Sequence, residues 1–278
     1  MTPEEAYFFD LTGFLLIRNV ISADELHQAV TTVNALEEHV QRNIDSTPVK
    51  KGHYGAEYHV DPSYKYAARR FGAGGNGIVI EDFINFGPGL DQCIAHPRIL
   101  PYVQEMIVGR FVITSLQVFF RFQGNFTPTH MGGPIDSRNR FYYRGANVLD
   151  TETGEQRFRH FELNVVRVVI ALHDIALGDG PLCVVPGSHK SNLHSPYSQD
   201  PTKEPLMTGI PMSAGDVLFF TENLRHGGLP ITSGKTRKTV HITYQPRWTS
   251  SPSALHWNGR IPLTDDVRSR LGNAAQLF

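Results

Sequence analysis

Residues 165–188 read VVRVVIALHDIALGDGPLCVVPGS, and this stretch decides the predicted fold class. It holds two runs rich in β-branched and apolar residues, 165–173 and 181–185. The glycine-containing turn 178–180 separates them, and Pro-Gly-Ser at 186–188 follows the second run. β-branched residues favour strands, whereas glycine, proline and serine favour turns. The stretch therefore predicts short strands joined by tight turns.

Similar strand-like runs occur on either side of it, at 13–17, 111–122, 216–221 and 238–246. Many short strands with glycine-rich turns are typical of a sandwich or barrel and not of alternating βαβ units. Most of these strands follow the predicted helices in the chain. The pattern predicts an α+β fold, with helices packed on one face of a jelly-roll-like β core.

The first part of the chain carries helix signals. Thr2 and Ser22 each begin a capping-box pattern, with a glutamate three residues later. The helix after Thr2 is short because a strand-like run follows, and the helix after Ser22 runs to about residue 43. Residues 97–108 predict a further helix. The polar residues 44–76 predict a long loop or lid, since long loops in compact domains are usually functional.

Composition limits the class of protein. The chain has 278 residues, 40% hydrophobic and 19% charged, which is enough to bury one large core, and it shows no linker or repeat. We therefore expect a single domain, 1–278. A net charge of -1 gives no reason to expect attraction to a nucleic acid polymer or a membrane. Two cysteines exclude a disulfide framework, and the N-terminus lacks a secretory pattern. These features predict a soluble cytoplasmic protein.

Two histidines stand out by their setting. His130 begins the segment HMGG, and His226 lies in LRHGG, so each occupies a glycine-flanked turn after a β-rich run. A non-haem iron oxygenase takes two histidines and one carboxylate, which comes from a His-x-Asp or His-x-Glu pair. In this chain the carboxylate position holds Gly132. Arg237 follows His226 at the start of another strand-like run.

Four segments in this order resemble the phytanoyl-CoA dioxygenase-like branch of the Fe(II)- and 2-oxoglutarate-dependent oxygenases. They are residues 9–17 with the helix that follows, His130 after its β run, GPLCVVPGSHK at 180–190, and Ala-Gly-Asp at 214–216 leading to His226. The resemblance implies a double-stranded β-helix (jelly-roll, cupin-like) core with flanking N-terminal helices. It also implies an iron held near one open end of that core.

The resemblance assigns roles to four of these residues. It implies that His130 and His226 bind Fe(II), and that Arg237 pairs with the distal carboxylate of 2-oxoglutarate, a bidentate contact that suits a planar guanidinium. Gln117 is a candidate for binding the same cofactor, and a core-facing amide is the alternative. His189 in the Pro-Gly-Ser-His turn is predicted to be structural.

Gly132 leaves three hypotheses open. In the first, chloride occupies the position of the missing carboxylate, as in the Fe(II)- and 2-oxoglutarate-dependent halogenases, which the His-x-Gly motif resembles. In the second, water or another carboxylate, Asp136 or Glu162, completes the site and the product is hydroxylated. In the third, the protein is a non-catalytic binding protein of the same fold. The predicted function is the halogenase, which chlorinates an unactivated C–H bond of a free small molecule with dioxygen as co-substrate.

The polar residues 134–160 are rich in arginine and predict a substrate-binding segment. Arginine and tyrosine together suit phosphate binding and stacking on a base, and a solvated basic loop is the alternative. A nucleotide such as dAMP is the substrate that we predict, by resemblance to the free-nucleotide halogenases. The candidate substrate-binding residues are Arg138, Arg140, Tyr142, Tyr143 and Arg144.

Overall fold

The computed structural model describes residues 1–51, 56–131, 143–149, 152–153, 156–191, 193, 195–248, 261 and 263–278. Its α-helices are α1 (Pro3–Thr12), α2 (Ala23–Asn43), α3 (Asp91–Ile94), α4 (Leu100–Met106) and α6 (Asp265–Leu271). Its strands are β1 (Phe14–Ile17), β2 (Val49–Lys51), β3 (Glu57–Val60), β4 (Ala67–Phe71), β5 (Gly77–Glu81), β6 (Phe111–Arg121), β7 (Thr127–His130), β8 (Tyr143–Leu149), β9 (Gln156–Leu163), β10 (Val166–Ala171), β11 (Leu182–Val184), β12 (Thr208–Gly209), β13 (Val217–Thr221), β14 (His226–Gly228) and β15 (Arg237–Pro246).

The first two helices begin where the sequence predicts. The side chains of Thr2 and Ser22 accept hydrogen bonds from the backbone amides of Glu5 and Glu25, and each glutamate reaches back to its cap residue. Both capping boxes are therefore formed, and they satisfy backbone donors that have no partner within the helix. The left-handed Gly13 ends α1, so the chain can turn directly into β1.

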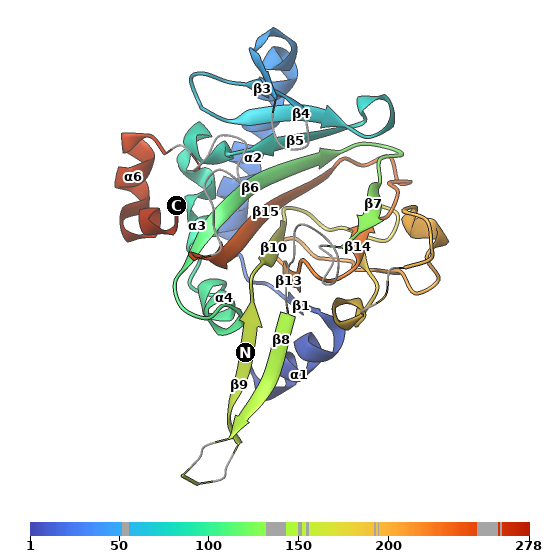
Figure 1. Ribbon diagram of the computed structural model, residues 1–278. Coiled ribbons are helices and arrows are strands. Elements are labelled where there is room, and N and C mark those ends of the chain that lie inside the picture. The colour runs from blue at the N-terminus through green and yellow to red at the C-terminus, as the bar shows by residue number, and fades with distance from the viewer. Residues whose placement is uncertain are drawn as a thin grey trace.

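The strands form a large sheet and a smaller one. The large sheet has the order β1-β13-β10-β15-β6-β5-β4-β3-β2, and the smaller sheet has the order β12-β11-β14-β7. Within the large sheet, β15 pairs antiparallel with β10 on one side and with β6 on the other. Figure 1 shows α2, α3, α4 and α6 on one side of the large sheet, with β7 and β14 on the other. The predicted α+β fold with a jelly-roll core is confirmed.

Side chains alternate between the two faces of the large sheet. On β6, Leu116, Val118 and Phe120 belong to the main hydrophobic core, as do Val240 and Ile242 on β15. The intervening residues point to the opposite face, toward the smaller sheet, because successive side chains of a strand alternate. A second hydrophobic cluster, with members on β10, β11 and β13, joins the two sheets at one end. The space between the sheets is therefore part apolar core and part polar interior.

The prediction of a loop or lid at residues 44–76 is wrong in part. Within the described residues of this segment, β2, β3 and β4 form antiparallel strands that extend the large sheet beyond β5. Their shortness and polar composition hid them, because three to five residues are too few to show a clear alternation of apolar and polar side chains. Residues within the segment 134–160, predicted to bind substrate, form the hairpin β8–β9, which projects from the body of the molecule (Figure 1). The described helices include none of the length and apolarity that a membrane span requires.

Candidate active site

The two predicted metal histidines meet across the smaller sheet. His130 ends β7, His226 begins β14, and the two residues are direct partners in the antiparallel register. Their ring centroids lie 4.2 Å apart. His226 is 6% exposed, whereas His130 is exposed. Strand pairing therefore brings together two imidazoles that are far apart in the sequence.

Both histidines are oriented by the same local contact. Nδ1 of His130 lies 2.8 Å from the carbonyl oxygen of Pro128, and Nδ1 of His226 lies 2.7 Å from that of Leu224. A carbonyl oxygen only accepts, so each Nδ1 carries the proton and each Nε2 keeps a free lone pair. Metal-binding histidines show this arrangement, with the second ring nitrogen donating to a carbonyl or carboxylate. The backbone therefore holds both rings in the tautomer that a metal requires.

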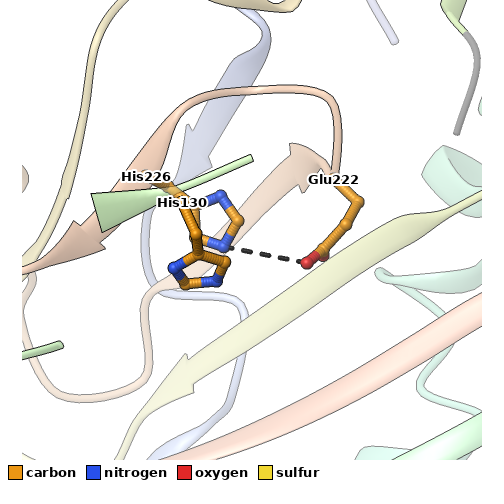
Figure 2. Close-up of side chains that lie close together, drawn as sticks. All are labelled: His130, Glu222 and His226. Carbon is orange, nitrogen blue, oxygen red and sulfur yellow. Dashed lines mark ion pairs between the residues drawn. The ribbon is translucent and has the colours of Figure 1, made fainter. Parts of the chain in front are cut away.

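A carboxylate lies beside the two rings. Glu222 follows β13 in the turn that leads to His226, and its carboxylate points toward the imidazoles (Figure 2). Its Oε1 lies 3.9 Å from Nε2 of His226. One ligand atom each from His130, Glu222 and His226 lie within 4.8 Å of one another, and no other such cluster occurs in the part of the chain that the structure describes. Two imidazoles and a carboxylate are the donor set of non-haem iron(II) sites.

Burial and neighbouring charges set the protonation of this cluster. Burial lowers the pKa of His226 to about 3, and His130 beside it acts in the same direction. The imidazole is therefore neutral near pH 7, as a ligand must be. Burial would raise the pKa of Glu222, but Arg167 and the two histidines outweigh burial and lower that pKa to about 2. Glu222 is thus an anion.

Two buried arginines lie on the inner face of the large sheet, next to the histidines' sheet. Arg237 begins β15 and is paired in register with Arg121 at the end of β6; they are 3% and 4% exposed. Nη1 of Arg237 donates to the carbonyl oxygen of Gly180. Nε of Arg237, and Nε and Nη1 of Arg121, have no hydrogen-bond partner among the described residues. No carboxylate in that part of the chain forms an ion pair with either arginine. The pair is therefore a buried positive site without a counter-charge.

Charge repulsion is evident in this pair. Burial lowers the pKa of Arg121 well below its usual value, and Arg237 lowers it further. Burial lowers the pKa of Arg237 to about 10. Burying two cations without an anion is costly, so the arrangement suits a carboxylate that binds between the sheets.

The other predicted site residues have different surroundings. Gln117 lies on the inner face of β6, where its Oε1 accepts from Arg167 at 3.3 Å and its Nε2 donates to Glu81 at 3.1 Å. The Tyr143 hydroxyl donates to Oδ1 of Asp10 at 2.5 Å, so this side chain lies against α1. The described residues do not include Gly132, Arg138, Arg140, Tyr142 or the candidate carboxylate Asp136.

The remaining candidate carboxylate lies on the hairpin. Glu162 on β9 is 3.7 Å from Nη1 of Arg144 on β8, and it is not part of the metal-ligand cluster. His189, predicted to be structural, is buried with Nε2 3.1 Å from the carbonyl oxygen of Asp10.

Sequence reasoning missed Glu222, Arg121 and Arg167. A signal for Arg121 was available, because alternate positions of residues 115–121 (SLQVFFR) and 237–243 (RKTVHIT) are polar, with Phe119 as the one exception. Such alternation predicts a strand with one polar face. Arg167 follows the same rule in β10, where it interrupts a run of valines. Glu222 lies in a turn and has no periodic signal.

Residues 9–239 match the phytanoyl-CoA dioxygenase (PhyH) family, which is well over half of the 278 residues. The chain belongs to the phytanoyl-CoA dioxygenase family. The resemblance read from the sequence is thus confirmed at the level of the family, and its halogenase branch is not. The comparison with curated proteins finds no match.

Several solved structures share the fold. HygX from Streptomyces hygroscopicus, with nickel and 2-oxoglutarate bound, is 20% identical with a TM-score of 0.59, over 89% of this chain and 88% of HygX. SnoK, an alpha-ketoglutarate-dependent carbocyclase of nogalamycin biosynthesis, is 18% identical with a TM-score of 0.58, over 88% and 84%. AviO1 from Streptomyces viridochromogenes Tue57 is 18% identical with a TM-score of 0.55, over 88% and 94%. At these identities the likeness concerns the fold.

The donor atoms fit the groups that this family implies. The two Nε2 lone pairs and the Glu222 carboxylate match iron(II), and the unpartnered guanidinium atoms of Arg121 and Arg237 match one carboxylate of a dicarboxylic acid.

Proposed function

We propose that the protein is an iron(II)- and 2-oxoglutarate-dependent enzyme that oxidises an unactivated C–H bond of a small molecule. The observation that carries the proposal is the pair of histidines whose Nδ1 atoms both lie within hydrogen-bond distance of backbone carbonyls, together with a buried arginine pair that has no counter-charge among the described residues. HygX and SnoK, which share the fold, carry or depend on 2-oxoglutarate. A non-catalytic binding protein would need neither feature.

In this proposal each residue has a defined task. Nε2 of His130 and Nε2 of His226 hold the iron, while their Nδ1 atoms keep the rings oriented. Arg237 and Arg121 bind the distal carboxylate of 2-oxoglutarate, and the anion removes the repulsion between them. Phe71 and Phe119, with their ring centroids 5.6 and 5.9 Å from the Arg121 guanidinium, shield it from water. When bound, iron and 2-oxoglutarate activate dioxygen and yield succinate and carbon dioxide.

Hydroxylation is the outcome that the geometry supports best. The buried anionic carboxylate of Glu222 lies beside the histidines, where it offers the third donor that a hydroxylase uses. Chlorination is the second candidate, and Gly132 carries it, because glycine two residues after His130 supplies no side-chain ligand. A nucleotide substrate such as dAMP also stays a prediction, since most of the residues that suggested it lie outside the described residues.

The experiment is a co-substrate screen. The purified protein is supplied with iron(II) and 2-oxoglutarate, and oxygen consumption and succinate formation are measured against pools of small molecules, nucleotides included, with and without chloride. A hydroxylase adds one oxygen to the product at zero halide, whereas a halogenase gives the isotope pair of chlorine. His226→Ala should abolish both signals. Succinate formation that does not depend on iron, or that survives His226→Ala, would refute the proposal.

A further inference from the structure

The two carboxylate oxygens of Glu222 have different surroundings: one forms an ion pair with Arg167, and the other points toward the histidines. Its side chain is 9% exposed, so both oxygens need partners inside the protein. Oε2 accepts a hydrogen bond from Nε of Arg167 at 2.8 Å. Oε1 faces the imidazoles and lies 3.9 Å from Nε2 of His226 (Figure 2). The ion pair with Arg167 therefore compensates the charge without using the oxygen that points at the rings.

Arg167 is itself held in place by a chain of hydrogen bonds on the inner face of the large sheet. Its Nη1 donates to Oε1 of Gln117 at 3.3 Å, and Nε2 of Gln117 donates to Oε1 of Glu81 at 3.1 Å. The same oxygen of Glu81 accepts from the Tyr58 hydroxyl at 3.1 Å. This series of hydrogen bonds links residues of β10, β6, β5 and β3. It therefore fixes the direction from which the Arg167 side chain reaches Glu222. Such partners orient a ligand and are needed for its affinity.

The distances favour a ligand role over a purely structural ion pair. Imidazole nitrogens and carboxylate oxygens bind divalent metals at about 2.0–2.2 Å, so adjacent ligand atoms lie about 3 Å apart. Oε1 of Glu222 and Nε2 of His226 are 3.9 Å apart, and a small torsion of the glutamate side chain closes that difference. A structural partner of Arg167 alone would have no reason to direct its free oxygen at two imidazoles.

We propose that Glu222 is the carboxylate ligand of the iron and that Arg167 is its positioning residue. The inference rests on the proposed function and deepens it. The ligand comes from the turn four residues before His226, whereas the His-x-Asp pattern takes it from the residue at position 132, which is glycine here. If Glu222 completes the ligand set, it occupies the coordination position that a halide would otherwise take. This favours transfer of oxygen to the substrate over transfer of chlorine.

The test measures metal binding in the absence of turnover. Cobalt(II) is titrated anaerobically into the metal-free protein, followed by calorimetry and by the visible absorption of the bound ion. Glu222→Gln keeps the shape of the side chain and removes its charge. We expect it to weaken cobalt affinity about 100-fold and to change the absorption spectrum, and Arg167→Gln to weaken affinity about 10-fold. The double variant Glu222→Gln/Arg167→Gln removes both charges, so its loss of affinity cannot come from an unpaired arginine.

Glu204 provides a matched control. It is a buried carboxylate, 2.6 Å from Nε of Arg225, and it stands outside the metal-ligand cluster. Glu204→Gln should leave cobalt affinity and spectrum unchanged, whatever it does to the melting temperature. If wild-type protein binds cobalt through His130 and His226, and both Glu222 variants bind it with the same affinity and spectrum, the inference is wrong and the proposed function stands. If wild-type protein binds no metal, the proposed function itself fails.

Discussion

Arg121 and Arg237 are neighbours in the interior, with guanidinium atoms that meet no carboxylate among the described residues. Two buried cations destabilise a fold unless an anion binds between them. Binding sites tolerate such a loss of stability because the bound ligand offsets it. Without a bound anion, the pair should therefore destabilise the fold, and a single substitution should relieve the repulsion.

We expect Arg121→Met to raise the melting temperature of the cofactor-free protein by about 2–4 °C, because it removes one of two repelling charges and keeps the side-chain volume. The same variant should bind 2-oxoglutarate about 10-fold more weakly, since it loses a charged hydrogen-bond donor. Arg237→Met should weaken 2-oxoglutarate binding further. Differential scanning fluorimetry and calorimetric titration with 2-oxoglutarate measure the two effects on one sample.

Arg225 is the control for this prediction. It is a mostly buried arginine, with 11% of its side chain exposed, and Glu204 neutralises it at 2.6 Å. Arg225→Met leaves the buried carboxylate of Glu204 without its ion-pair partner. It should lower the melting temperature without changing the affinity for 2-oxoglutarate. A fall in the melting temperature of Arg121→Met, equal to that of Arg225→Met, would show that Arg121 is structural.

At the scale of elements, β14 shapes the space around Arg121. A Cβ atom built on Gly228 would lie 2.4 Å from Nη1 of Arg121, so only glycine lets the guanidinium pack against this strand. The lack of a side chain at Gly228 thus lets the Arg121 guanidinium approach the backbone of β14 closely. β14 therefore holds a candidate metal ligand, His226, and also contacts the Arg121 guanidinium.

Gly228→Ala should therefore displace the Arg121 guanidinium and weaken 2-oxoglutarate binding about 10-fold, while His226 in the same strand still binds metal. Gly178→Ala is the control, because its Cβ would meet Thr232 Oγ1 at an ordinary 3.4 Å. Calorimetry with 2-oxoglutarate and with cobalt(II) separates the two sites. Unchanged 2-oxoglutarate affinity in Gly228→Ala would exclude this packing role.

The elements were predicted unequally well. The helices after Thr2 and Ser22 could be predicted from their capping boxes. The strands β6, β10, β13 and β15 could be predicted because each contains an apolar run that no glycine or proline interrupts. The strands within residues 44–76 could not be predicted, because three to five residues with one exposed face carry no clear periodicity. Successive pairing makes them strands, since β4 pairs with β5, β3 with β4 and β2 with β3.

At the scale of the whole molecule, His189 joins α1 to the β core. Its Nε2 lies 3.1 Å from the carbonyl oxygen of Asp10, and so carries the proton, while its buried Nδ1 has no partner among the described residues. Protonation would bury a second N–H without an acceptor. Burial accordingly lowers the pKa of His189 to about 4.

A histidine whose pKa is lowered by folding stabilises the fold fully above its unfolded pKa, near 6.5, and loses that contribution as pH falls toward about 4. The free energy of unfolding of metal-free protein should fall across this window, by at most about 3 kcal/mol from this residue. His189→Asn should flatten that dependence, whereas His27→Gln, at an exposed position of α2, should not. Urea unfolding at a series of pH values measures it, and equal slopes in all three proteins would contradict the assignment.

The sequence by itself determined the fold class, the family and three residues of the candidate site. His130 and His226 could be predicted because each lies in a glycine-flanked turn after a strand-like run, and Arg237 because it begins the next such run; these patterns are local and resemble those of the family. Glu222, Arg167 and Arg121 were decided only by the tertiary structure. Glu222 faces the histidines because the register of β10 against β13 brings Arg167 to its other oxygen, and Arg121 meets Arg237 only through the pairing of β6 with β15. Strand register acts between residues far apart in the chain, so no local pattern contains it.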